Sequence, residues 1–379
     1  MMMTYLIKLF DEVMGRIITS VLLKPIVPNS NKYPNTLFLI RPGGIGDAVL
    51  LAPAIRSLKK NYPGIHITVL AEQRNAGVFQ LIPGVDRLFC YDRNLELLQA
   101  LRISYDVVID SEQSHQLSAV VARFVSAPLK IGFNTNERRR MFTHTIPYSH
   151  DDYETARFSN LLEPLGVEVE SVNLELPFLS LPHSAISDVA GLLEELNGKP
   201  FVTLFPGASI AERRWGTERF RLVVDALSAF GIQVVIVGGK EDRQQGGGIA
   251  DGGLGLNLAG LTTLAETAAV IQKSSLLLSG DSGLLHIAVG LGVPTVSLFG
   301  PGRAKKWAPK GERHIVINRE LPCSPCTTFG ATPPCPIDAR CMRDITTDEV
   351  VNAVTMLLTS VGTMPSSCCK RDWIEVKKG

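Results

Sequence analysis

The chain has 379 residues, more than one hydrophobic core usually serves, so we expect two domains. With 45% hydrophobic and 20% charged residues, its composition is that of a globular protein. The net charge of +1 gives no electrostatic reason to expect nucleic acid as a partner. No apolar run approaches the roughly 18–20 residues that span a bilayer. Of the seven cysteines, four lie within residues 323–341, whereas a secreted disulfide scaffold would be shorter and more evenly rich in cysteine, so we expect a reducing cytoplasm.

The first segment, residues 4–23, places apolar side chains on one helical face and charged or small polar ones on the other. Charges interrupt it, so it is not the core of a signal peptide. Two interpretations stay open: the helix packs on protein surface, or it lies in a membrane interface. Pro25 and Pro28 end the helix, and residues 1–34 therefore form an amphipathic helix with a linker.

A buried strand at residues 36–41 runs into the sequence PGGIGD at residues 42–47, after which a helix begins. The glycines permit a tight turn and a close approach of backbone to a ligand. Asp47 falls at the helix start, where a carboxylate either caps the helix or acts as a general base in a cleft. A dinucleotide-binding fingerprint would need a third glycine at position 49, which is Val49.

Further apolar runs, separated by helical stretches, predict a parallel, doubly wound sheet in a first domain of residues 35–183. The expected strands are residues 65–70, 86–91, 106–110 and 130–133. A charge run with Arg138, Arg139 and Arg140 follows the last of them. It is either a solvated face or a site for an acidic acceptor, because arginine forks match carboxylates and phosphates.

Residues 184–345 repeat this pattern, with strands expected at 200–205, 232–237, 275–278 and 294–299. The long loop after the first strand contains Ser209 and Arg214, which can hold a phosphate; alternatively, it is a surface loop anchored by a buried Trp215. Glu241 follows the second strand, where a carboxylate either accepts hydrogen bonds from a ribose or starts a helix.

The third strand of this half ends in the sequence GDSG at residues 280–283, and a helix follows at once. This turn points backbone N–H groups and the positive end of a helix dipole at one place, where an anionic diphosphate is the natural occupant. The alternative is a plain strand-to-helix turn capped by Asp281 or Ser282. Both halves are thus predicted to be Rossmann-like α/β domains with glycine turns at strand carboxyl ends, where ligands bind.

Four motifs in this order resemble those of glycosyltransferase family 9, the ADP-heptose:lipopolysaccharide heptosyltransferases. They lie at residues 41–53, 205–215, 238–241 and 280–301. The resemblance implies a GT-B fold, in which two Rossmann-like domains face each other across a cleft. It also implies inverting transfer of heptose from ADP-heptose to a lipopolysaccharide inner-core or related acceptor. Ala208-Ser209 and Arg214 stand where some members have Thr-Thr and Lys, which leaves the donor sugar open.

The resemblance further implies roles for individual residues. Asp47 would be the general base for the acceptor hydroxyl. The acceptor side would include Gly44, Gly46, Arg138, Arg139 and Arg140. The donor side would include Ser209, Arg214, Glu241, Asp281, Ser282, Gly283, Leu284 and His286. No cofactor is required, because helix N-termini and Arg214 can carry the charge of the leaving group.

Four cysteines, Cys323, Cys326, Cys335 and Cys341, have the spacing C-x2-C-x8-C-x5-C. Four thiolates can hold a structural zinc, and disulfides or free thiols are the alternatives. Similar cysteines occur in many members of the family that the motifs resemble. Residues 346–379 are expected to form a closing helix and a terminal tail.

The expected partners are a nucleotide sugar and an acidic, lipopolysaccharide-type glycolipid. The amphipathic start and the arginine run fit a cytoplasmic enzyme in peripheral contact with the inner face of the inner membrane. Three alternatives remain: a glycosyltransferase with another nucleotide sugar, a GT-B nucleotide-sugar epimerase, and a nucleotide-binding regulatory protein.

Overall fold

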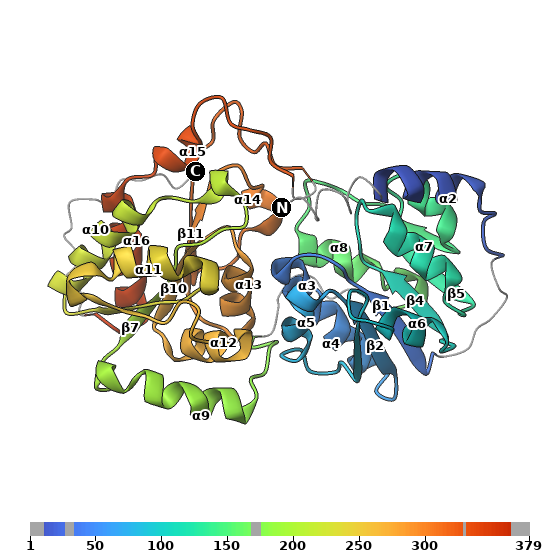
Figure 1. Ribbon diagram of the computed structural model, residues 1–379, viewed down its shortest axis with the longest axis horizontal. Helices are drawn as coiled ribbons and strands as arrows, with labels where there is room; N and C mark the ends of the chain where they lie inside the picture. The colour runs from blue at the N-terminus through green and yellow to red at the C-terminus, as the bar shows by residue number, and fades with distance from the viewer. Residues whose placement is uncertain (1–10, 27–33, 168–175, 329–330, 365–379) are drawn as a thin grey trace. The chain divides into compact units, whose positions relative to one another are not determined.

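The computed structural model describes residues 11–26, 34–167, 176–328 and 331–364 (Figure 1). The chain divides into two compact units, Met1–Ser180 and Leu181–Gly379. The domain boundary expected at residue 183 lies just beyond this division. The predicted tail after residue 364 and the first residues of the predicted amphipathic helix lie outside the described residues.

The first unit contains a parallel sheet with the strand order β3-β2-β1-β4-β5-β6. Its strands form from the apolar runs because both faces of a parallel sheet are buried, and β4 is buried throughout. The sequence did not indicate the short β6. The strands are β1 (Thr36–Ile40), β2 (His66–Ala71), β3 (Arg87–Cys90), β4 (Val107–Asp110), β5 (Leu129–Phe133) and β6 (His144–Ile146).

Helices connect these strands and flank the sheet on both faces (Figure 1). The α-helices after β1 are α3 (Ile45–Leu50), α4 (Ala52–Asn61), α5 (Gln73–Phe79), α6 (Glu96–Leu101), α7 (Gln116–Phe124) and α8 (Glu154–Asn160). Two 3-10 turns, η2 (Glu137–Met141) and η3 (Glu163–Leu165), complete this part of the unit.

The N-terminal segment packs on the first unit itself. A π-helical turn, η1 (Asp11–Gly15), leads into the short helix α2 (Arg16–Val21). The Asp11 carboxylate accepts hydrogen bonds from the backbone N–H groups of Gln116 and Leu117, at 3.1 and 2.7 Å, and so caps the N-terminus of α7. Thr19 Oγ1 donates to Gln116 Oε1 at 2.6 Å. The described residues of this segment thus pack on protein surface, and contact of its outward face with a membrane stays a prediction.

The second unit repeats the topology of the first. Its sheet order is β12-β11-β10-β7-β8-β9, with all pairings parallel. Counted from β7, this is the 3-2-1-4-5-6 order of Rossmann folds, which the first unit also has. The strands are β7 (Phe201–Phe205), β8 (Gln233–Ile236), β9 (Gly255–Asn257), β10 (Leu276–Gly280), β11 (Thr295–Phe299) and β12 (His314–Asn318).

The helices of the second unit include long, capped segments and short turns near the strand ends. The α-helices are α9 (His183–Leu192), α10 (Thr217–Ala229), α11 (Arg243–Ile249), α12 (Leu264–Lys273), α13 (Gly283–Gly290), α14 (Ala304–Trp307), α15 (Arg340–Arg343) and α16 (Thr347–Ser360). The 3-10 turns are η4 (Glu194–Leu196), η5 (Ala211–Arg213), η6 (Lys240–Asp242) and η7 (Asp251–Gly253).

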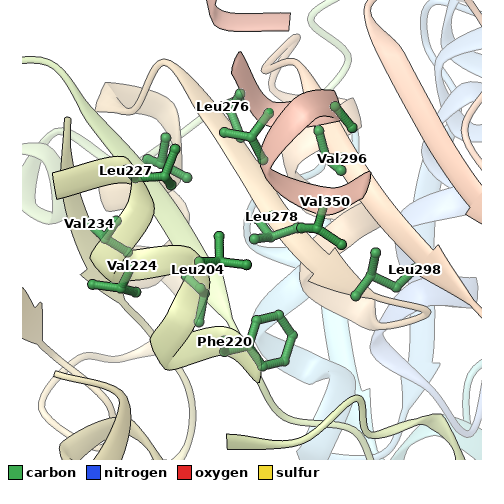
Figure 2. Close-up of a cluster of buried hydrophobic side chains, with 14 of the residues drawn as sticks. Leu204, Phe220, Val224, Leu227, Val234, Leu276, Leu278, Val296, Leu298 and Val350 are labelled. Carbon is green, nitrogen blue, oxygen red and sulfur yellow. The ribbon is translucent and has the colours of Figure 1, made fainter. Parts of the chain in front are cut away.

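Figure 2 shows the main core of the second unit, where strands of the sheet meet α10 and α16. Leu204, Leu278 and Leu298 come from neighbouring strands, and Phe220 and Val350 come from the two helices. All five side chains are at most 1% exposed. The closing helix α16 therefore belongs to the core of the second unit. In the part of the chain that the structure describes, no helix is long and apolar enough to cross a membrane.

Candidate active site

In the first unit, the residues after β1 and β4 form one polar cluster. These strands are neighbours, with Ile40 opposite Asp110. The strand order reverses between them, because β2 and β3 lie on one side and β5 and β6 on the other. Open α/β sheets bind ligands at such a switch point, outside the strand carboxyl ends.

The turn after β1 places Asp47 in the first turn of α3. Gly43 has a φ of +102°, a left-handed conformation that glycine adopts without strain. Gly44 is the N-cap residue and has an extended backbone. A Cβ atom on Gly44 would lie 3.8 Å from Asp47 Oδ2, so the carboxylate lies against the glycine turn. The Asp47 side chain is 27% exposed and thus open to a ligand.

Arg41 is the buried cation of this cluster, with 2% of its side chain exposed. Its Nη2 lies 3.5 Å from Asp47 Oδ2 and 3.2 Å from Glu112 Oε2. Its Nε and Nη1 each donate to a backbone carbonyl group at 2.8 Å. Burial opposes ionisation of Glu112, but positive charges, Arg41 first among them, outweigh burial and lower the pKa of Glu112 to about 2. Glu112 is therefore an anion at neutral pH.

A second buried acid, Glu154, extends the cluster. Its carboxylate accepts hydrogen bonds from Gln113 Nε2 at 2.6 Å and from the Tyr148 hydroxyl at 3.1 Å. Burial and the charge of Glu154 raise the pKa of Tyr148, so the phenol stays protonated. Burial disfavours the charged form of Arg41, but Asp47, Glu112 and Glu154 together outweigh it and raise the pKa of Arg41.

The arginine run after β5 divides between interior and surface. Arg138 is fully buried, and its Nη2 lies 2.5 Å from Asp110 Oδ2. Its Nε donates to the backbone carbonyl of His115 at 3.2 Å. We expected Arg138 on the acceptor side, but its side chain is buried and paired with Asp110. The candidate acceptor contacts in this run are therefore Arg139 and Arg140. Arg139 and Arg140 are 56% and 32% exposed, respectively.

In the second unit, the turn after β10 brings several predicted donor residues together. Ser282 is the N-cap of α13, and its Oγ accepts a hydrogen bond from the backbone N–H of Leu285 at 3.3 Å. Asp281 and His286 are 7% and 4% exposed. Burial lowers the pKa of His286 to about 4, against the opposing charge of Asp281, so the imidazole is neutral at pH 7. Gly283 and Leu284 form the first turn of α13.

The loop after β7 presents two arginines, and only one of them contacts the turn after β10. Arg213 Nη1 lies 2.9 Å from Asp281 Oδ2, and the Arg213 side chain is 14% exposed. Arg214 is exposed, and its Nε donates to the carbonyl of Ala208 at 3.0 Å within its own loop. Ser209 is also exposed on this loop. Arg213 is thus the arginine that pairs with Asp281, and diphosphate binding by the exposed Arg214 stays a prediction.

Trp215 ends this loop as a buried anchor. It is 4% exposed, and its Nε1 donates to the carbonyl of Ile345 at 3.0 Å. Glu241 lies after β8 in the turn η6 and is exposed. Beside it, Asp242 Oδ2 accepts the backbone N–H of Gly239 at 2.9 Å. A ligand at the carboxyl ends of β7, β8 and β10 would meet both turns and the loop.

Sequence reasoning missed three charged residues of these clusters: Arg41, Glu112 and Arg213. Arg41 was visible as the last residue of a predicted strand next to the glycine turn. Glu112 follows the predicted strand at 106–110, but nothing in its local pattern marks it as buried. Arg213 and Arg214 are adjacent in a loop without periodicity, so the sequence offers no signal that separates them.

The second unit contains a cavity of about 380 Å³. Most of the predicted donor residues do not line it. It includes Arg214, Trp215 and Glu212, together with Arg219 and Arg343. Asp281, His286 and Glu241 do not line it. We therefore place the candidate donor site at the strand carboxyl ends rather than in this cavity.

The four predicted cysteine ligands line a second cavity, of about 160 Å³. All four are free thiols. Burial raises the pKa of the Cys326 and Cys341 thiols, and the neighbouring thiols raise it further. Among the described residues, no group of three or more His, Cys, Asp or Glu side chains is arranged to hold a metal ion.

Known proteins share both the sequence and the fold. A family model described as glycosyltransferase family 9 (heptosyltransferase) matches residues 94–333. Lipopolysaccharide heptosyltransferase 3 of Escherichia coli is 30% identical over 306 residues, which cover 73% of this chain and 88% of the relative.

Two solved structures from Escherichia coli have the same fold. ADP-heptose LPS heptosyltransferase II has a TM-score of 0.70 at 22% identity, covering 86% of this chain and 99% of that one. Heptosyltransferase WaaC, solved with ADP-2-deoxy-2-fluoro heptose, has a TM-score of 0.65 at 16% identity, covering 85% of this chain and 99% of that one.

Two parallel six-stranded sheets, each with a glycine turn at its switch point, are shared with these heptosyltransferase structures and place the chain in the GT-B fold class. The chain belongs to glycosyltransferase family 9, the heptosyltransferase family. The predicted fold class, family and enzyme class are thus confirmed.

Proposed function

We propose that this enzyme transfers heptose from ADP-heptose to a sugar of the lipopolysaccharide core, with inversion at the anomeric carbon. The Escherichia coli relative at 30% identity is named a lipopolysaccharide heptosyltransferase. WaaC, which shares the fold, was solved with an ADP-heptose analogue. The donor turn of this chain, with helix N-terminal N–H groups beside Arg213, suits a diphosphate.

The observation that carries the proposal is the position of Asp47. Its carboxylate is partly exposed at the switch point of the first sheet, 3.5 Å from the buried Arg41. The positive charge of Arg41 favours the carboxylate form, which is the form a general base requires. Asp47 takes the proton of the acceptor hydroxyl while that oxygen forms a bond to the anomeric carbon. The bond from that carbon to the diphosphate oxygen breaks on the opposite side, so the configuration inverts.

The second unit stabilises the departing ADP. Negative charge develops on the diphosphate as the bond breaks, and preorganised N–H groups at the start of α13 receive it. Arg213, held by Asp281, adds a positive charge, and Ser209, Ser282 and the exposed Arg214 are further candidate diphosphate contacts. Glu241 is the candidate ribose contact after β8. Neutral His286 is placed to donate or accept a hydrogen bond rather than to pair as an ion.

Acceptor and membrane contacts belong to the first unit in this proposal. Arg139 and Arg140 are exposed and suit phosphate or carboxylate groups of the acceptor. Gly44, the N-cap of α3, and Gly46, in its first turn, are the candidate acceptor contacts next to Asp47. The outward face of α2 carries Ile17 and Val21, which are 54% and 75% exposed. This face fits peripheral contact with the inner face of the cytoplasmic membrane, where the lipid acceptor would be met.

The test is turnover of the Asp47→Asn variant with ADP-heptose and a heptose-deficient lipopolysaccharide core acceptor. Asparagine keeps the size of the side chain but cannot take the proton. We expect kcat to fall by about a hundredfold to ten-thousandfold, with ADP affinity changed less than about twofold. Asp188→Asn, at an exposed position of α9, is the matched control and should keep full activity. Near-normal turnover of Asp47→Asn would show that Asp47 is not the general base and that its role is confined to the start of α3.

A further inference from the structure

The turn after β2 is tied by hydrogen bonds to the glycine turn after β1. Asn75, in α5, is fully buried, and its Nδ2 donates to the backbone carbonyl of Arg41 at 3.1 Å. The backbone N–H of Glu72, the N-cap of α5, donates to Asn75 Oδ1 at 2.9 Å. The Glu72 carboxylate in turn accepts the backbone N–H of Gly43 at 3.2 Å. These hydrogen bonds fix the start of α5 against the glycine turn.

Arg74, the second residue of α5, is an exposed cation where these two turns meet. Its side chain is 59% exposed, and its Nε lies 3.0 Å from Glu72 Oε1. Because the other carboxylate oxygen of Glu72 accepts the N–H of Gly43, Glu72 holds the inner edge of the guanidinium beside the turn. In the part of the chain that the structure describes, no hydrogen bond or ion pair engages Nη1 or Nη2 of Arg74. Both groups can therefore donate to a ligand.

Gly43 separates Arg74 from the buried Arg41. A Cβ atom on Gly43 would lie 3.4 Å from Arg41 Nη2 and 3.9 Å from Arg74 Nη2. Both guanidinium groups thus border the place where this residue has no side chain, and Arg41 Nη2 also lies 3.5 Å from Asp47 Oδ2. Arg41 already uses its donors within the protein. Arg74 is therefore the arginine of this turn that a ligand can contact.

We propose that Arg74 binds an anionic group of the acceptor, a carboxylate or a phosphate, at a subsite over Gly43. The inference rests on the proposed function, because it takes Asp47 as the base that receives the acceptor hydroxyl. A guanidinium matches the oxygen geometry of both anionic groups and binds them through paired hydrogen bonds. Because Arg74 and Asp47 flank the same glycine turn, an acidic sugar bound at Arg74 brings its own hydroxyl, or that of the adjoining sugar, to Asp47. Arg74 thus favours acidic acceptors over neutral ones.

The first test compares the KM for the core oligosaccharide acceptor between wild type and Arg74→Gln, at saturating ADP-heptose. We expect KM to rise about tenfold, with kcat and ADP affinity changed less than about threefold. Arg74→Lys keeps the charge but loses the planar fork, so its KM should be intermediate. Arg102→Gln, at an exposed position after α6, is the matched control and should keep the wild-type KM. An unchanged KM in Arg74→Gln with a lowered thermal unfolding midpoint would overturn the inference, because it would show a purely structural ion pair with Glu72.

Modified acceptors identify which anionic group Arg74 binds. Hydrogen fluoride removes phosphate from the core oligosaccharide, and carbodiimide coupling converts its carboxylates to neutral amides. Removing the group that meets Arg74 should raise the wild-type KM about tenfold and leave the KM of Arg74→Gln unchanged, because both changes remove one contact. If both modifications raise the KM of Arg74→Gln as much as that of wild type, the inference is wrong.

A binding measurement separates this inference from the proposed function. Titration calorimetry of the unmodified core oligosaccharide, without donor, needs no turnover. We expect Arg74→Gln to bind the oligosaccharide about tenfold more weakly than wild type does. Equal affinities would overturn the inference even where wild type transfers heptose. A wild type that transfers no heptose but shows the tenfold difference in affinity would overturn the proposed function and support the anion subsite.

Discussion

Two arginines, Arg41 and Arg138, are the largest side chains that the first unit buries almost completely. Each is paired with a buried carboxylate, Arg41 with Glu112 and Arg138 with Asp110. Removing both charges from water is costly, and the pairing offsets that cost only while both partners remain. The two pairs nevertheless differ in their surroundings. Arg41 also reaches the partly exposed Asp47, whereas the carboxylate that pairs with Arg138 is fully buried, so we assign Arg138 a structural role.

At this scale we predict that Arg138→Met destabilises the protein by about 3–5 kcal/mol, because it leaves Asp110 as an unpaired buried charge. Arg139→Met, one residue away and 56% exposed, should change the free energy of unfolding by less than about 0.5 kcal/mol. Denaturant unfolding followed by circular dichroism measures both. Equal stability of the two variants would show that the Arg138–Asp110 pair contributes nothing to the fold.

At the scale of elements, glycines are required where two segments approach closely. A Cβ atom on Gly302 would lie 2.1 Å from Asp281 Oδ2, so any other residue in this turn after β11 would have to displace the Asp281 carboxylate. In the glycine run at residues 246–248, a close approach of this kind explains Gly246. It forms part of α11 despite its low helix propensity, and a Cβ on Gly246 would lie 2.4 Å from Asn257 Oδ1.

We predict that Gly302→Ala displaces the Asp281 carboxylate and breaks its ion pair with Arg213. The expected cost is about 1–3 kcal/mol of stability, with weaker binding of ADP. Gly191→Ala is the control: this residue lies in α9 with open space around its Cβ position, so alanine should be neutral or stabilise by up to about 1 kcal/mol. Thermal unfolding with and without ADP distinguishes the two. An ADP-induced shift in Gly302→Ala equal to that of wild type would contradict the close approach.

At the scale of the molecule, the pKa values of buried groups make the stability of the protein depend on pH. Burial lowers the pKa of both His286 and His314 to about 4. The unfolded chain takes up protons on these histidines from about pH 6.5 downward, but the folded chain does not until about pH 4. Stability therefore falls as the pH is lowered through this window. Glu112, with its pKa lowered to about 2, adds a further loss between about pH 4.5 and 2.

We predict that the second unit loses about 2–3 kcal/mol of stability between pH 7 and pH 4.5 for each of the two histidines, His286 and His314. Tryptophan fluorescence reports this unit selectively, because Trp215 and Trp307 lie in it and residues 1–180 contain no tryptophan. His314→Gln should flatten the pH dependence, and His183→Gln, at an exposed position of α9, should leave it unchanged. Unfolding midpoints that do not move between pH 7 and pH 4.5 would contradict the burial of these imidazoles as neutral groups.

The amino-acid sequence by itself determined the two sheets, their glycine turns and the family. Buried parallel strands read as continuous apolar runs, and β1, β4, β7 and β10 were predicted to within two residues at each end. Turns such as the GDSG sequence at residues 280–283 depend on their own residues, so they too were visible. The strands that went unpredicted, β6, β9 and β12, lie at sheet edges, where burial is incomplete and the apolar signal is weaker.

Only the tertiary structure decided which charged side chain of a run meets which partner. Arg138 rather than its neighbours pairs with Asp110, and Arg213 rather than Arg214 pairs with Asp281. Both runs lie in loops or 3-10 turns, where no periodicity fixes the side-chain direction. The partner that selects one arginine is distant in sequence, and the gain from pairing a buried charge exists only once the sheet has brought the two segments together.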